Sequence, residues 1–170
     1  MNISLLKRPL LAATAVIIIS TAQGGHAQGL ESQFAFQIVE IAADGTETLV
    51  DRSSVYPGEV IEYAVSHMNN LEDDLNGLTF LAPVPNGVTL EFGSEFSSLA
   101  ASFEIQAEMD PMNEGLEWSA VPASRIVIAE DGTQHSEPVP ADAVQAVRWN
   151  LESALKSGES ALNTYRVVVN

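Results

Sequence analysis

Two groups of carboxylates come nearest to a site in the residue types and spacing of this chain. Glu72–Asp74 are consecutive in the segment NNLEDDLN, and Glu108, Asp110 and Glu114 lie just before or within the segment MDPMNEG. Carboxylates bind Ca²⁺, but calcium loops place them at alternate positions before a glycine. Consecutive carboxylates cannot all face one ion without a special turn. We therefore interpret both groups as solvated loop tips and keep calcium binding as the alternative.

The histidines give no catalytic or metal-binding pattern. His67 and His135 lie on or beside predicted strands, and no G-x-S-x-G or other nucleophile motif accompanies them. Cleavage after Gly25 would leave His26 at the N-terminus, as in some copper proteins, but no second His, Cys or Met cluster completes a copper site. We predict no catalytic, cofactor-binding or metal-ligating residue, and we place copper behind calcium.

Other chemistries also lack their residues. Glycoside hydrolysis needs two positioned acids in a cleft, and no aromatic-rich groove is predicted. Tyr63, Trp118 and Trp149 lie on predicted strands, where large aromatics fill a core more often than they stack on sugars. Lys156 is the only lysine after the first segment and lies in a Ser-Gly turn, which disfavours an isopeptide crosslink. The sequence therefore predicts a protein that is not an enzyme.

The first residues predict export. Lys7 and Arg8 precede the apolar segment Pro9–Ala22, and Ala27 ends a small-residue cleavage pattern before Gln28. We predict a cleaved signal peptide at 1–27 and one mature domain at 28–170, in the periplasm or outside the cell. An uncleaved anchor is the alternative, but the apolar core is short for a membrane span. The chain has no Cys, so disulfides and cysteine lipidation are excluded.

The charge of the chain excludes several partners. It has 23 acidic and 7 basic residues, and removing the leader leaves 5 basic residues and a net charge of −18. Such a surface repels nucleic acid and anionic membranes. Solubility in an exposed compartment explains the charge, and divalent-cation binding is the sharper alternative.

The elements that position these residues are short strands. Ile61, Tyr63 and Val65 alternate with polar or small residues, which is typical of a strand with one buried face. Turn signals recur about every ten residues, and Asp44-Gly45 and Asp131-Gly132 predict hairpins. The pattern favours an all-β sandwich of about seven or more strands. The expected strands are 34–41, 46–50, 59–67, 78–81, 88–92, 103–106, 116–118, 125–129, 133–135 and 164–169, with a polar loop over 68–76.

One segment has two periodicities. The segment Ala141–Leu155 has helical spacing at Val144, Val147, Leu151 and Leu155. Within it, Val147, Trp149 and Leu151 also alternate as in a strand. Periodicity alone leaves both readings open.

From Gln33 to Asn170 the chain resembles an immunoglobulin-like family of exported and surface bacterial proteins, known as domain of unknown function eleven. The shared motifs are the turn and strand at 57–69, the turn at 82–87, the strand at 149–151, the turn at 155–160 and the closing strand at 165–169. The resemblance implies an immunoglobulin-like antiparallel sandwich, with a strand at Val147–Leu151.

The chain departs from the family at three positions. His67 replaces an inward aliphatic residue, Ala82 an Asp, and Ser157 a Pro. The Ala82 departure removes the carboxylate that would organise that turn. The family implies no common catalytic activity. We therefore expect an exported, non-enzymatic structural or interaction module whose partner is another exported or cell-envelope component, with no cofactor; a divalent-metal-binding exported protein is the alternative.

Overall fold

The computed structural model describes residues 29–170. The predicted cleavage site and His26 lie outside those residues. Within them the chain is all-β, with twelve strands and one short 3₁₀ helix, η1 (Ala141–Ala143). No helix in this part of the chain is long and apolar enough to cross a membrane.

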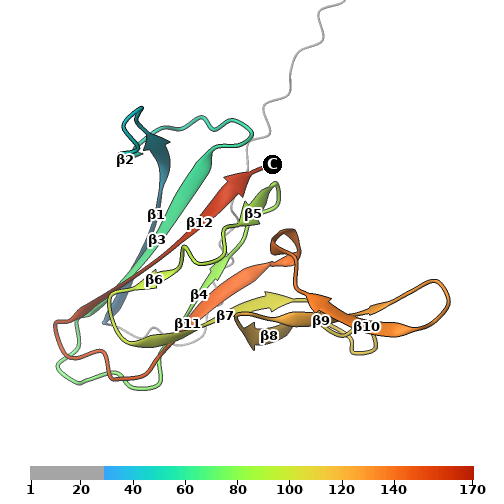
Figure 1. Ribbon diagram of the computed structural model, residues 1–170. Helices are drawn as coiled ribbons and strands as arrows, with labels where there is room; N and C mark the ends of the chain where they lie inside the picture. Colours follow the sequence, from blue (N-terminus) through green and yellow to red (C-terminus); the bar gives the residue numbers. More distant parts are fainter. Residues whose placement is uncertain (1–28) are drawn as a thin grey trace, which may run out of the picture.

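The strands form two main antiparallel sheets and a projecting hairpin (Figure 1). The first sheet has the order β2-β1-β3-β12-β5, with β6 also paired to β12. Its strands are β1 (Leu30–Ile41), β2 (Glu47–Val50), β3 (Val60–Asn69), β5 (Val88–Leu90), β6 (Phe96–Ser97) and β12 (Ser160–Val169). The second sheet has the order β4-β11-β7-β8. Its strands are β4 (Thr79–Pro83), β7 (Ala101–Ala107), β8 (Glu117–Ala120) and β11 (Ala146–Leu151). The hairpin pairs β9 (Ser124–Ile128) with β10 (Gln134–Pro138) and extends away from both sheets.

Two similar turns lead into the long central strands. Before β3, the Glu59 carboxylate accepts a hydrogen bond from the Tyr56 backbone N–H at 2.7 Å. Before β12, Glu159 accepts one from the Lys156 N–H at 2.9 Å. The glycine ahead of each glutamate has a positive φ, 86° and 71°, which a side chain would strain. The Gly-Glu pairs of the sequence therefore fix where both strands begin.

The core lies between the two main sheets. Trp149 of β11 and Tyr165 of β12 are almost completely buried and their ring centroids lie 6.0 Å apart. The Tyr165 hydroxyl donates to the Pro83 carbonyl at 2.6 Å, which ties β12 to β4. The buried cluster draws on both sheets, so the arrangement is sandwich-like.

The two sheets are offset. His67 of β3 stacks on Phe80 of β4, with ring centroids 3.7 Å apart, so this end of β4 lies over β3. Trp149 and Tyr165 likewise place β11 over β12. Since β4 is the last strand of its sheet, the next strand of the first sheet, β1, has no second-sheet strand above it among the described residues. The first sheet therefore extends past the second at β1.

Most predicted strands are confirmed, including both hairpins and the strand reading of Val147–Leu151. The helical reading of the Ala141–Leu155 segment is wrong, since only η1 is helical there. The expected strand 88–92 ends at Leu90, because Phe92 turns outward into a loop. The two-residue strand β6 is not among the strands that the sequence predicts. Strand β3 continues to the buried Asn69, inside the expected polar loop 68–76.

Two aromatics expected in the core lie nearer the surface. Tyr63 is only partly buried. Trp118 of β8 is also not in the core, because β8 is the edge of the second sheet. The Arg148 guanidinium instead covers its ring at 4.3 Å from the centroid, a cation–π contact.

Candidate functional site

An exposed aromatic surface lies on β1, at the margin of the first sheet. Residues opposite one another in the sheet share a face, and Phe34 and Phe36 lie opposite Val65 and Tyr63 of β3. Their rings are therefore on the core side, yet 47% of Phe34 and 46% of Phe36 is exposed. We call Phe34, Phe36 and Tyr63 the aromatic shelf.

The shelf continues the aromatic core into solvent. The Tyr63 ring lies 5.3 Å from Phe34 and 6.2 Å from Phe36, and on its other side it stacks on Tyr165 at 5.2 Å. Burial raises the pKa of the Tyr63 hydroxyl, so this side chain stays neutral. The three rings therefore contact one another and form one continuous apolar surface.

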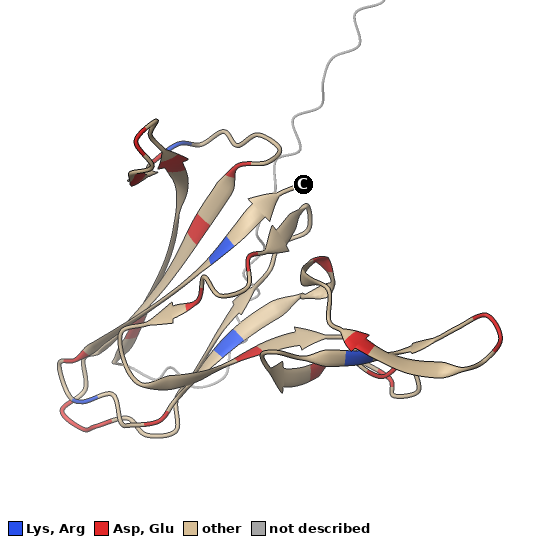
Figure 2. Ribbon diagram, in the orientation of Figure 1, with Lys and Arg blue, Asp and Glu red and all other residues tan. Residues whose placement is uncertain are grey.

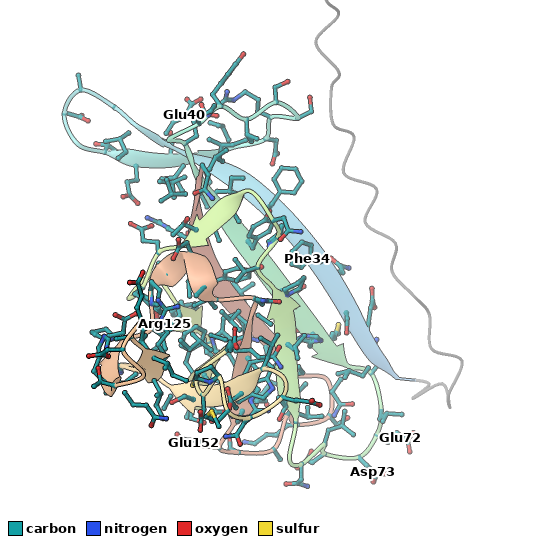
Figure 3. All side chains as sticks on the ribbon, turned by 90° about the vertical axis from the view of Figure 1, so that its right-hand side faces the viewer. Phe34, Glu40, Glu72, Asp73, Arg125 and Glu152 are labelled. Atoms are coloured by element: carbon teal, nitrogen blue, oxygen red, sulfur yellow. The ribbon has the colours of Figure 1, made fainter. Side chains whose placement is uncertain are left out.

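Acidic residues stand at both ends of the shelf. Glu40 is on the same face of β1 by alternation, and Glu72 and Asp73 lie in the loop after β3. Figure 3 shows Phe34 between Glu40 at one end of the molecule and Glu72 and Asp73 at the other. Glu40 has a neighbour in Arg52, 3.8 Å away, but Arg52 makes its closer contact, 2.6 Å, with Glu59. Arg52 holds the pKa of Glu59 below its ordinary value.

The acidic loops are not assembled into a metal site. No group of three or more His, Cys, Asp or Glu side chains is placed to hold an ion anywhere within residues 29–170. Asp74 accepts a hydrogen bond from the Ser157 backbone N–H at 3.0 Å. Asp110 accepts bonds from the Met112 N–H and the Asn113 amide within its own turn. These carboxylates therefore organise loops through bonds to protein donors.

The two histidines of the described part have different surroundings. The Nδ1 atom of His67 lies 2.7 Å from the Ser32 hydroxyl, and burial lowers the pKa of the ring. His67 is thus a packed residue at the boundary between the core and the shelf. His135 is exposed on the β9–β10 hairpin, 4.0 Å from Glu137.

The basic side chains on the sheets are already paired. Arg166 contacts Glu62 and Glu47, both at 2.9 Å, beside a shallow hollow lined by Phe92 and Phe96. Arg148 lies 2.6 Å from Glu104. This ion pair, together with the hydrogen bond that Glu104 accepts from the Asn150 amide, holds the pKa of the Glu104 carboxyl below its ordinary value. Figure 2 shows acidic residues on most loops and few basic ones. The surface available to a partner is therefore mainly acidic.

Lys156 lies exposed in the turn before β12, as expected. The shelf lies on strands that the sequence predicts, but the sequence does not show that this face is exposed. Its signal is the alternation of Phe34, Phe36 and Ile38 with Ala35 and Gln37, which a buried strand also shows. Exposure of that face depends on how far the second sheet extends.

Comparison of the chain with protein-family models, with curated proteins and with solved structures gave no match. The resemblance to domain of unknown function eleven stays a prediction, carried by the motifs of the sequence.

Proposed function

We propose that this chain is an exported immunoglobulin-like domain that acts as a non-enzymatic interaction module. Its partner is another exported or cell-envelope protein. The leader pattern at 1–27 supports export, and the antiparallel sheets, together with the Gly-Glu turns before β3 and β12, support the immunoglobulin-like assignment.

The observation that carries the proposal is the exposure of the aromatic shelf. Two phenylalanines on the core side of a sheet remain about half in solvent, although apolar faces of sandwiches are normally covered. Transfer of such surface from water stabilises a complex by roughly 25 cal/mol per Å² before the costs of association. A partner that covers the shelf is stabilised by this transfer free energy.

Calcium binding has no comparable support, since the carboxylates of the two acidic loops are directed to backbone donors or to solvent.

Site-specific photo-crosslinking in the native host tests the proposal. A benzophenone amino acid replaces Phe34 or Phe36 in two variants, and Phe96 in the control. Phe96 is 53% exposed on β6, so it matches the shelf residues in type and exposure but lies elsewhere. We expect one adduct of defined mass, with an exported protein, from positions 34 and 36.

Absence of an adduct, or equal adducts from all three positions, would contradict an interaction through the shelf. The non-enzymatic part of the proposal has its own test. Hydrolytic or redox turnover by purified protein, lost on changing one polar residue while the fold survives, would overturn it.

A further inference from the structure

We propose that the shelf is covered by an extended segment of the partner, which adds to the free edge of β4 as a further strand of the second sheet. This inference rests on the proposed function and specifies how the partner binds. The segment has apolar residues at alternate positions and a Lys or Arg at each end.

The first step concerns the free edge. β4 pairs with β11 only, and its other edge has no strand partner within residues 29–170. The Leu78 carbonyl accepts from Leu151, and the Val84 N–H donates to Gln145, so the backbone of even-numbered residues faces β11. Successive residues of a strand direct these groups to opposite sides. The N–H and carbonyl groups of Thr79 and Leu81 therefore point to the open side.

The end of this edge already shows an interaction on the open side. The Pro83 carbonyl, directed away from β11, accepts the hydrogen bond of the Tyr165 hydroxyl. Proline has no N–H, so Pro83 limits strand addition to the part of β4 that precedes it. Thr79 and Leu81 are the residues left to pair with an incoming strand.

The second step concerns the place that such a strand would occupy. Phe80 of β4 lies over His67 of β3, whose neighbour on β1 is Ser32, and the Pro83 end of β4 reaches Tyr165 of β12. The position beside β4 therefore runs from above β1 near Phe34 to above Tyr63 of β3. A strand paired to β4 would run about 4.8 Å from it and direct every second side chain toward the shelf. Backbone pairing and burial of Phe34, Phe36 and Tyr63 are thus achieved by one segment. This is the β-augmentation mode of peptide recognition.

The third step concerns charge. Glu40 stands beyond one end of the shelf and Glu72 and Asp73 beyond the other, which favours a segment with basic ends. A second copy of this chain fits poorly, since each copy carries 23 acidic residues against 5 basic ones in residues 29–170. The observations therefore favour a basic, alternating segment of a different protein.

The test uses the purified exported protein and three synthetic peptides, with affinity measured by fluorescence anisotropy. The peptide KVTVTVK alternates, KVVVTTK has the same composition without alternation, and EVTVTVE has acidic ends. We expect the first to bind at least about tenfold more tightly than either of the others. Methylating the backbone nitrogens of KVTVTVK one at a time should weaken binding at every second position only, since only those N–H groups pair with β4.

Variants of Leu81 provide the matched pair. Leu81→Pro removes an edge N–H but no hydrogen bond to β11, and Leu81→Ala removes the same exposed side chain while keeping the N–H. Proline should lower peptide affinity at least about tenfold, and alanine should change it less than twofold. The methylated peptides give the same information if Leu81→Pro unfolds the protein.

Equal binding of KVTVTVK and KVVVTTK, insensitivity to methylation, or no binding of any peptide would overturn strand addition. The crosslinking experiment separates this failure from failure of the proposed function. Adducts at positions 34 and 36 with no effect of Leu81→Pro would leave a partner on the shelf that binds without pairing to β4.

Discussion

The inner face of the first sheet has a covered half and an uncovered half. On β12, Tyr165 is fully buried beneath Trp149 of the second sheet. On β1, two residues of the same kind, Phe34 and Phe36, are half-exposed. Tyr63 on β3 lies between Tyr165 and Phe34, and its ring stacks on both. Aromatic residues therefore occur across this face, and their exposure follows what lies opposite them. Ile38, on the same face of β1, is buried.

This difference shows which aromatics support the fold and which are available to a partner. Buried rings gain both from transfer out of water and from close packing, and their removal leaves a cavity. Half-exposed rings give the fold only part of that free energy. Measurements that separate stability from binding should thus divide the sheet between β3 and β1.

The largest contrast is expected between Trp149→Ala and Phe36→Ala. The first should lower the free energy of unfolding by about 3–5 kcal/mol, because it empties the centre of the core. The second should cost about 1 kcal/mol or less, because half of the ring is already in water. Urea denaturation measures both, with equal m-values as the control for two-state behaviour. Similar losses for the two variants would show that the shelf is part of the core.

Two buried asparagines give the next contrast. Both amide atoms of Asn163 on β12 lack a hydrogen-bond partner among the described residues. Asn69 is equally buried, but its amide donates to the carbonyls of Asp73 and Leu155, and its oxygen accepts from the Leu71 N–H. Asn163→Leu should raise the free energy of unfolding by about 1–2 kcal/mol, and Asn69→Leu should lower it by about 3 kcal/mol. Thermal and urea denaturation check the signs, and a loss of stability in both variants would assign Asn163 a structural partner.

Local patterns determined how much of this fold the sequence could predict. The two hairpins follow from Asp44-Gly45 and Asp131-Gly132, since the Asp side chain of each accepts the N–H of the Thr two residues on. The strand at Val147–Leu151 needed the family resemblance, because its residues also fit a helix. It is settled by pairing with β4 and β7, which are distant in sequence.

The shelf could not be predicted for the same physical reason. Alternation identifies the apolar face of β1 but not what lies opposite it, and coverage depends on the second sheet ending at β4. His67 shows the reverse case. The sequence shows that its residue type is unusual for an inward strand position, but the stacking on Phe80 and the bond to Ser32 come from strands at different places in the chain.

His67 allows the boundary between the two halves to be probed by pH. Burial lowers the pKa of its ring in the folded state, so between the folded and unfolded pKa values the unfolded chain binds more protons. The contribution of His67 is therefore complete above the unfolded pKa of about 6.5 and declines as the pH falls through that value. It stops declining below the folded pKa.

The test compares unfolding at pH 7.5 and pH 5.0 in the parent, in His67→Phe and in His135→Phe. Phenylalanine keeps a ring against Phe80 but cannot titrate, so His67→Phe should lose less stability on acidification than the parent. The difference should be small, because the His67 ring is only half-buried. His135 is exposed, and His135→Phe should follow the parent. An unchanged pH dependence in His67→Phe would show that the boundary is open to water.

The smallest effect is expected from calcium at the acidic end of the shelf. Glu72 and Asp73 stand beside Asp74, which is held by the Ser157 N–H, and no metal-binding group of three is formed within residues 29–170. Millimolar Ca²⁺ should therefore shift the melting temperature no more than Mg²⁺ or NaCl at matched ionic strength, because all three only screen repulsion between carboxylates. The variant Asp73→Asn with Asp74→Asn should respond alike to the three salts. A shift specific to Ca²⁺ that this variant abolishes would make the loop a calcium site. The basic ends proposed for the partner segment would then compete with the ion, and added Ca²⁺ should weaken binding of KVTVTVK more than Mg²⁺ does.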